Sequence, residues 1–60
     1  MFKVYRWNEL VASFETWDDV MKFVGARALE DNYGIFRHWE MDGATYFDCG
    51  PDTFKAVEEN

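Results

Sequence analysis

The sequence predicts an α+β domain of the ββαββ type, in which an antiparallel sheet of two hairpins packs on one amphipathic helix. Three features lead to this fold class: a turn inside an apolar N-terminal segment, a capped amphipathic segment, and an Asp-Gly pair between two strand-like segments. The sixty residues are enough for a single domain, which we assign to residues 1–60. Twelve of them are Phe, Trp or Tyr, and these rings are expected to fill a small core.

Residues 2–14 are expected to form a hairpin, because they are rich in β-branched and aromatic residues and are interrupted only at Trp7-Asn8-Glu9. Asn8 accepts the left-handed conformation that a tight turn needs. An even-length loop divides the apolar side chains between two faces, with Tyr5, Leu10, Ala12 and Phe14 on one and Phe2, Val4 and Val11 on the other. Both faces of the sheet are therefore expected to be substantially apolar.

The amphipathic segment is expected to form a helix from Trp17 to about Asp31. Thr16 offers a hydroxyl to the unpaired amide groups of the first turn, and Asp19 follows three residues later as the acid of a capping box. Asn32-Tyr33-Gly34 supplies the stop signal, since glycine suits the positive φ of a helix C-cap.

The inner face of this helix is predicted from the i, i+3, i+4 and i+7 spacing of its apolar residues, which are Trp17, Val20, Met21, Val24 and Ala28. Gly25 weakens the middle of the helix relative to alanine. We expect close packing on the sheet to be the reason for a glycine at this position.

The Asp42-Gly43 pair is the strongest hairpin signal in the chain and predicts a two-residue loop between strands at 35–40 and 44–49. This loop sets the register, which pairs Arg37 with Asp48, His38 with Phe47, Trp39 with Tyr46 and Phe36 with Cys49. Gly50-Pro51 is expected to end the second strand. A short C-terminal helical turn follows in the prediction, capped by Asp52 or Thr53 and carrying Phe54 and Val57.

The charge of the chain restricts its partners. Twelve acidic and six basic residues give a formal net charge of −6, which repels nucleic-acid phosphates and anionic membranes and favours a basic partner. No apolar run approaches the ~18 residues of a membrane span, and the N-terminal segment is too charged and too short for a secretory signal. The single cysteine, Cys49, fits a reducing compartment, so we expect a cytoplasmic protein.

Few residues could carry chemistry, and we predict neither an enzyme nor a metal or cofactor site. His38 and Cys49 are expected to share a sheet face, but a structural zinc site needs four ligands. With Asp48 or Glu40 they imitate a Cys-His-acid set, but acidic neighbours disfavour a thiolate at Cys49. Adjacent acids point in different directions and are expected to be solvated, as at Asp18-Asp19, Glu30-Asp31 and Glu58-Glu59.

The function that these features favour is a protein-interaction module that binds a partner protein or forms a homodimer. One helix covers only one of two apolar sheet faces, so the other needs the tail residues Phe54 and Val57, a twin subunit or a partner to cover it. If the C-terminal tail covers this second face, the aromatic side chains on it are ordinary core residues. The interaction candidates are of the types enriched at binding hot spots, namely Trp7, Arg37, Trp39 and Tyr46.

Two alternatives involve nucleic acids. An acidic decoy would imitate phosphates with carboxylates and occupy the nucleic-acid site of another protein, and its candidates are Asp18, Asp19, Glu30 and Asp31. A single-strand binder would instead stack bases on Trp39 and Tyr46 beside Arg37. The net charge argues against direct nucleic-acid binding, because six scattered basic residues cannot form a positive groove.

The first third of the chain resembles the beginning of many small uncharacterised bacteriophage and bacterial proteins. The resemblance rests on Phe2-Lys3-Val4-Tyr5-Arg6 and on Asn8 to Thr16, which correspond to a strand, a tight turn, a second strand and a helix cap. Asn8 stands where glycine is common in such turns. The resemblance implies a phage-type accessory protein that binds a host component, and it carries over no functional residue.

Overall fold

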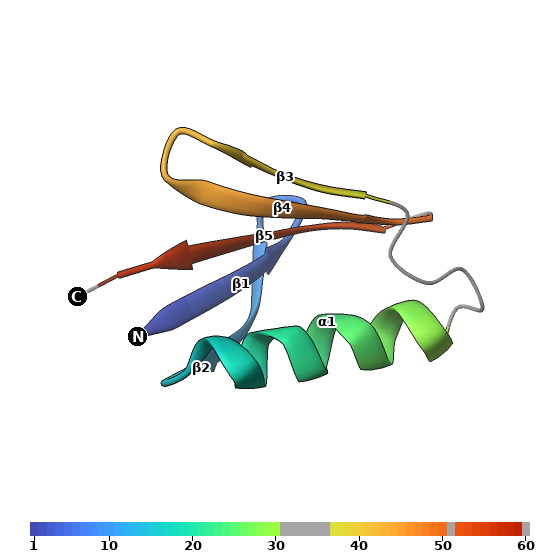
Figure 1. Cartoon of the computed structure of the whole chain (residues 1–60), viewed down its shortest axis with the longest axis horizontal. Coiled ribbons are helices and arrows are strands. Elements are labelled where there is room, and N and C mark those ends of the chain that lie inside the picture. The colour runs from blue at the N-terminus through green and yellow to red at the C-terminus, as the bar shows by residue number, and fades with distance from the viewer. Residues whose placement is uncertain (31–36, 51, 60) are drawn as a thin grey trace.

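The computed structural model describes residues 1–30, 37–50 and 52–59, which form a two-layer arrangement of an antiparallel sheet and one helix (Figure 1). The elements are β1 (Phe2–Arg6), β2 (Glu9–Phe14), α1 (Trp17–Glu30), β3 (Arg37–Met41), β4 (Ala44–Cys49) and β5 (Asp52–Glu58). The strand order across the sheet is β2-β1-β5-β4-β3, and each neighbouring pair is antiparallel.

The predicted ββαββ fold class is wrong at the C-terminal segment, because residues 52–58 form the central strand β5 and not a helical turn. The buried residues Phe54 and Ala56 alternate with more exposed ones, which is the period of two that a strand shows. Phe54 and Val57 therefore lie on opposite faces of the sheet. Because β5 pairs with both β1 and β4, it joins the two hairpins into one five-stranded sheet.

The first hairpin has the predicted even-length loop, since Arg6 pairs with Glu9 across Trp7 and Asn8. The left-handed residue of this loop is Trp7, with a φ of 57°, so its assignment to Asn8 is wrong. A positive φ is uncommon for a residue with a bulky side chain, and Trp7 is therefore a strained position.

A β-bulge changes how this hairpin divides its side chains between the two faces. Tyr5 pairs with Leu10, but the preceding residue of β1 pairs with Ala12, so Val11 is the extra residue. The predicted grouping is right for Tyr5 and Leu10. It is wrong for Ala12 and Phe14, which lie on the face that packs against α1.

The second hairpin has the predicted loop and register. Asp42 and Gly43 have φ values of 53° and 80°, which suit the two-residue loop of a hairpin. The predicted pairs Arg37–Asp48, His38–Phe47 and Trp39–Tyr46 are all present. The predicted Phe36–Cys49 pair and the expected strand residue Ile35 lie outside the described residues.

The start of α1 has the predicted cap. The backbone N–H of Asp19 donates to Thr16 Oγ1 at 3.2 Å, and the Thr16 hydroxyl donates to Asp19 Oδ2 at 2.9 Å. These bonds satisfy one of the amide groups that a helix start leaves unpaired. The predicted last residue, Asp31, and the stop signal at 32–34 lie outside the described residues.

The inner face of α1 is formed by Val20, Val24 and Ala28, as predicted. Trp17 and Met21 lie at its exposed margin, because the helix is rotated so that Phe23 packs against the core instead. The expected close packing of Gly25 is wrong, since a Cβ atom at this position would meet no atom within 4 Å.

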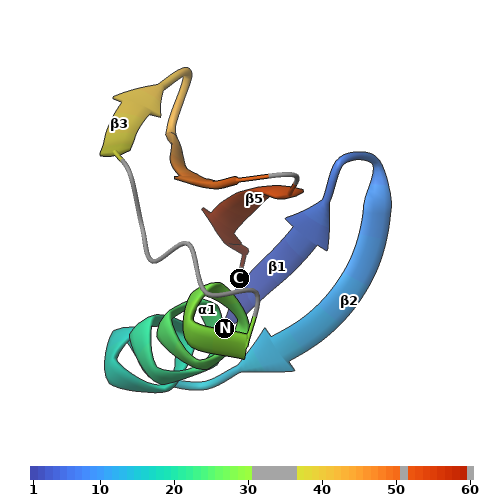
Figure 2. The ribbon, with the colours of Figure 1, turned by 90° about the vertical axis from the view of Figure 1, so that its right-hand side faces the viewer.

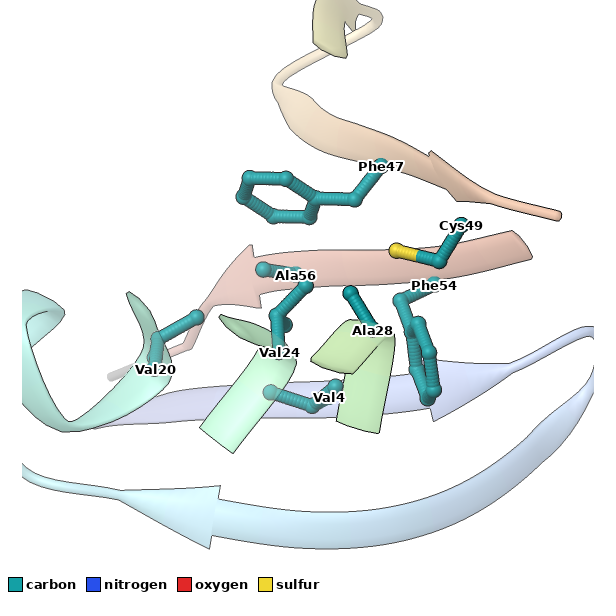
Figure 3. Close-up of a cluster of buried hydrophobic side chains, with 8 residues drawn as sticks. All are labelled: Val4, Val20, Val24, Ala28, Phe47, Cys49, Phe54 and Ala56. Carbon is teal, nitrogen blue, oxygen red and sulfur yellow. The ribbon is translucent and has the colours of Figure 1, made fainter. Parts of the chain in front are cut away.

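The hydrophobic core lies between α1 and one face of the sheet (Figure 3). It is built from α1, β1, β4 and β5, and its residues are Val4, Val20, Val24, Ala28, Phe47, Cys49, Phe54 and Ala56. Seen end-on, α1 lies beside β1, whereas β3 stands at the far edge of the twisted sheet (Figure 2). The helix thus covers one face of the sheet and leaves β3 largely exposed.

Candidate functional site

The candidate site is the open face, by which we mean the side of the sheet opposite α1. It is crossed by a row of side chains that pair in register over all five strands, in the order Leu10, Tyr5, Lys55, Tyr46 and Trp39. These residues alternate with the core residues, so they point away from α1. No helix of the described residues covers this row.

Three of the residues predicted from the sequence meet at one end of this row. The Trp39 and Tyr46 rings are stacked, with 5.4 Å between centroids and 9° between planes. The Arg37 guanidinium lies 4.9 Å from the centroid of the Trp39 ring, within cation–π range. Asp48 Oδ2 lies 3.6 Å from Arg37 Nε and so helps to orient the guanidinium. At this end of the open face, Trp39 and Tyr46 therefore form a small aromatic platform with the Arg37 guanidinium beside it.

The other half of the row is organised around Tyr5. Lys55 Nζ lies 6.0 Å from the centroid of the Tyr5 ring, and the Tyr5 hydroxyl donates to Glu59 Oε2 at 3.4 Å. Lys3 Nζ lies 3.5 Å from the other oxygen of the same carboxylate. The aromatic rings of the open face are thus interleaved with cations along its whole width.

Trp7 lies at this second half and not beside Trp39. Its side chain is 63% exposed, and it borders a hollow of about 270 Å³ together with Tyr5, Lys55 and Val57. Core packing does not explain a tryptophan at this position, because Trp7 is exposed and its backbone has a positive φ. The structure therefore brings Arg37, Trp39 and Tyr46 together and places Trp7 beside the same row.

The acids of the open face are balanced by cations, although the chain as a whole carries a charge of −6. Asp48 pairs with Arg37, and Glu59 pairs with Lys3. Lys55 adds a further positive charge between them. Most of the other acids among the described residues belong to loops, to α1 or to the α1 side of the sheet.

The acidic candidates of the decoy interpretation are spread along α1. Asp18 and Asp19 lie in the first helical turn, where Asp19 belongs to the cap. Glu30 is the last residue of α1, about 18 Å from the first turn at 1.5 Å per residue. Its Oε2 atom lies 4.0 Å from Arg27 Nη1. Asp31 lies outside the described residues, so the described candidates occupy the two ends of the helix.

Two of the residues considered for metal binding or nucleophilic chemistry, His38 and Cys49, share the α1 face of the sheet as predicted, because His38 pairs with Phe47 and Phe47 lies in the core with Cys49. Cys49 is fully buried in the core, whereas His38 is exposed on β3 with its ring 6.4 Å from that of Phe47. Asp48 points to the open face and pairs with Arg37, so it does not face Cys49. Within the described residues, no group of three or more His, Cys, Asp or Glu side chains is arranged to hold a metal ion.

Sequence reasoning missed Tyr5 and Lys55 as members of the site. The sequence places Tyr5 on a sheet face without marking it as a site residue, and the predicted C-terminal helical turn contains Lys55. The available signal was the alternation of Phe54 and Ala56 with polar or β-branched residues, which is typical of a strand. Once β5 is recognised as a strand, Lys55 falls between Tyr46 and Tyr5.

Comparisons with protein-family models, with curated proteins and with solved structures find no match to this chain. In residues 1–30, 37–50 and 52–59, no helix has both the length and the apolar character that crossing a membrane requires.

Proposed function

We propose that this protein is a small, cytoplasmic protein-interaction module that self-associates, with the open face of a second copy as the occupant of its own open face. The observation that carries the proposal is the row of Leu10, Tyr5, Lys55, Tyr46 and Trp39, which crosses all five strands and is not covered by α1. An uncovered sheet face that is rich in aromatic and apolar side chains is typical of a protein–protein interface.

The aromatic platform has the composition and the rigidity of a binding hot spot. Tryptophan, tyrosine and arginine are the residues enriched at such spots. The Trp39 ring stacks on the Tyr46 ring and lies 4.9 Å from the guanidinium of Arg37, which forms an ion pair with Asp48. Side chains that are already ordered lose less conformational entropy on binding, so this platform is preorganised for association.

The charge distribution favours the open face over other surfaces as the place where two copies meet. Each copy carries a net charge of −6, so the copies repel each other at most orientations. On the open face, Asp48 and Glu59 are neutralised by Arg37 and Lys3. The like-charge repulsion between two copies is therefore smallest when their open faces approach.

The size of the open face is adequate for a dimer. A standard interface buries about 800 Å² on each partner, which is roughly a fifth of the 4153 Å² surface of this domain. The molecule measures 33 × 21 × 18 Å, so one broad face supplies an area of this order. Two such sheets pack with about 10 Å between them, a distance that interdigitating Trp39 and Leu10 side chains fill.

The same geometry gives less support to single-strand binding. A stacking platform needs free ring faces and unpaired cations that contact phosphates. Here Arg37 and Tyr46 both occupy the Trp39 ring, and Arg37 and Lys3 are paired with acids. A nucleic acid would have to displace these contacts against the net charge of the chain.

The proposal is tested by measuring the molar mass of the protein by sedimentation equilibrium across roughly 1 µM to 1 mM, the range of moderate to weak affinities. We expect the mass to rise from 7.1 kDa towards twice that value. Trp39→Thr keeps a strand-forming residue and removes the ring, so it should hold the protein as a monomer. Leu29→Ala removes an apolar side chain that is 75% exposed on α1, and it should leave the association unchanged.

Two results would contradict the proposal. One is a constant mass of 7.1 kDa over the whole concentration range. The other is an association that Leu29→Ala weakens as much as Trp39→Thr does. An oligothymidylate added to a parallel sample reports on the alternative occupant, because a saturable complex with the monomer would assign the open face to single-stranded nucleic acid.

A further inference from the structure

A second surface feature lies on the α1 side of the sheet, separate from the open face. It is a groove of about 550 Å³, lined by residues of the α1 start and of the β3–β4 loop. These two segments lie at the same end of the ribbon (Figure 1). The apolar lining of the groove includes Phe2, Trp17 and Ala56, and its acidic lining consists of Glu40, Asp42 and Glu58. A groove of this volume is within the range of binding sites for small groups.

The three carboxylates of the groove come from separate elements. Glu40 belongs to β3, Asp42 to the β3–β4 loop and Glu58 to the end of β5. Among the described residues, no lysine or arginine forms a salt bridge with any of them, in contrast to Asp48 and Glu59 on the open face. The groove therefore carries negative charge that the described chain does not neutralise.

The aromatic wall of the groove is held in place by the fold. The Trp17 ring packs edge-to-face on Phe2 with 5.5 Å between centroids, and it lies 6.1 Å from the Phe47 ring. Trp17 is nevertheless 38% exposed, so part of its indole remains open to the groove. A fixed indole beside carboxylates offers a cation both a ring surface and hydrogen-bond acceptors.

We infer that this groove binds an arginine side chain presented by a basic segment of a partner protein. The planar guanidinium stacks on the exposed part of Trp17 while its N–H groups donate to the carboxylates of Glu40 and Glu58. Arginine suits this site better than lysine, because its donors lie in a plane and its charge is weakly hydrated. The net charge of −6 attracts a basic segment from a distance and thus speeds its encounter with the groove.

This inference does not depend on self-association, because Phe2, Trp17, Glu40 and Glu58 lie on the α1 side and the proposed dimer uses the other side. The three tryptophans of the chain report on the two surfaces separately. Trp17 lines the groove, whereas Trp7 and Trp39 belong to the open face.

The test is an NMR titration of ¹⁵N-labelled protein with a capped glycine-arginine peptide. The same peptide with citrulline in place of arginine is the control, because citrulline has nearly the same shape without the charge. We expect saturable shifts of the Trp17 indole N–H and of the amides of Thr45 and Ala56, which also line the groove, with little change at Trp7 and Trp39. The citrulline peptide should cause none of these shifts, and added salt should weaken the arginine complex.

Charge variants at matched positions distinguish binding in the groove from general electrostatic attraction to the acidic protein. Glu40→Gln and Glu58→Gln should each weaken the arginine complex about two- to fivefold, as for loss of one exposed ion pair. Glu9→Gln changes the net charge equally but lies in β2, at the opposite edge of the sheet from β3, and should leave the affinity unchanged. Equal weakening by Glu9→Gln, unsaturable shifts, or shifts centred on Trp39 would each overturn the inference.

Discussion

The ring of Trp39 lies parallel to the ring of Tyr46 on the neighbouring strand, with 5.4 Å between centroids and 9° between planes. The two residues are direct cross-strand partners in the β3–β4 hairpin. Stacked pairs of this kind contribute about 0.5–1.5 kcal/mol beyond the area they bury. β3 is an edge strand that pairs only with β4 among the described strands, so this side-chain pair adds to the backbone ladder that holds it in the sheet.

We therefore expect a double-mutant cycle of Trp39→Ala and Tyr46→Ala to give a coupling energy of about 0.5–1.5 kcal/mol in the free energy of unfolding. Chemical denaturation of the two single variants and the double variant measures it. Tyr46→Phe keeps the ring and should retain most of the coupling. Additive losses would show that the two rings do not stabilise each other.

Replacing Gly25 by alanine should stabilise the protein by about 0.5–1 kcal/mol. Alanine is the better helix former, and the added Cβ would meet no atom within 4 Å. Gly43→Ala is the matched comparison, because it also adds one methyl group into open space but at a φ of 80°, where alanine is strained. Thermal unfolding should show a higher midpoint for the first variant and a lower midpoint for the second.

The cap of α1 should account for about 1 kcal/mol of stability. Thr16→Ala removes the hydroxyl that accepts from the Asp19 amide and donates to the Asp19 carboxylate. Thr16→Ser keeps that hydroxyl and should lose only a small part of this stability. The comparison is made by urea denaturation, and an equal loss in both variants would show that the cap is not the cause.

The central position of β5 makes Phe54 one of the most sensitive residues of the chain. Phe54→Ala should cost about 3–5 kcal/mol, which is comparable to the whole stability of a small domain. Val57→Ala, in the same strand but on the open face, should cost much less because Val57 is only partly buried. Hydrogen exchange of the wild-type protein offers a direct check, since the amides of β5 should be protected more strongly than those of β3.

The second hairpin was predictable because its determinants are local. Asp42 and Gly43 set the loop, and a two-residue loop leaves only one register for the strands on either side. The cluster of Arg37, Trp39 and Tyr46 followed from that register. This part of the site thus depends on residues close in sequence.

The first hairpin was only partly predictable, because its bulge depends on contacts with the helix. The extra residue Val11 turns Phe14 towards α1, where its ring lies 5.5 Å from that of Phe23. Nothing between Glu9 and Phe14 marks such an insertion in the sequence. The gain from burying Phe14 is a tertiary effect, and it outweighs the regular pairing that the loop alone would favour.

The C-terminal strand was missed because its sequence fits two structures. Phe54 and Val57 are three residues apart, as on one side of a helical turn, while Phe54 and Ala56 alternate as in a strand. Residues 52–58 form a strand because they pair with β1, where Val4 is the partner of Ala56. The local alternation alone does not decide between the two structures, because the pairing that decides it joins segments far apart in the chain. Because the prediction lacked β5, it also left Lys55 out of the open face.

The position of β5 between β1 and β4 also sets the order in which this protein can fold during its synthesis. The β1–β2 and β3–β4 hairpins are translated first, but isolated hairpins are marginally stable in water. The core cannot close until Phe54 and Ala56 have left the ribosome, because both belong to the strand that joins the two halves. Until then, β1 and β4 each present an unpaired edge that can pair with other chains. We therefore expect a nascent chain halted before Asp52 to be prone to aggregation.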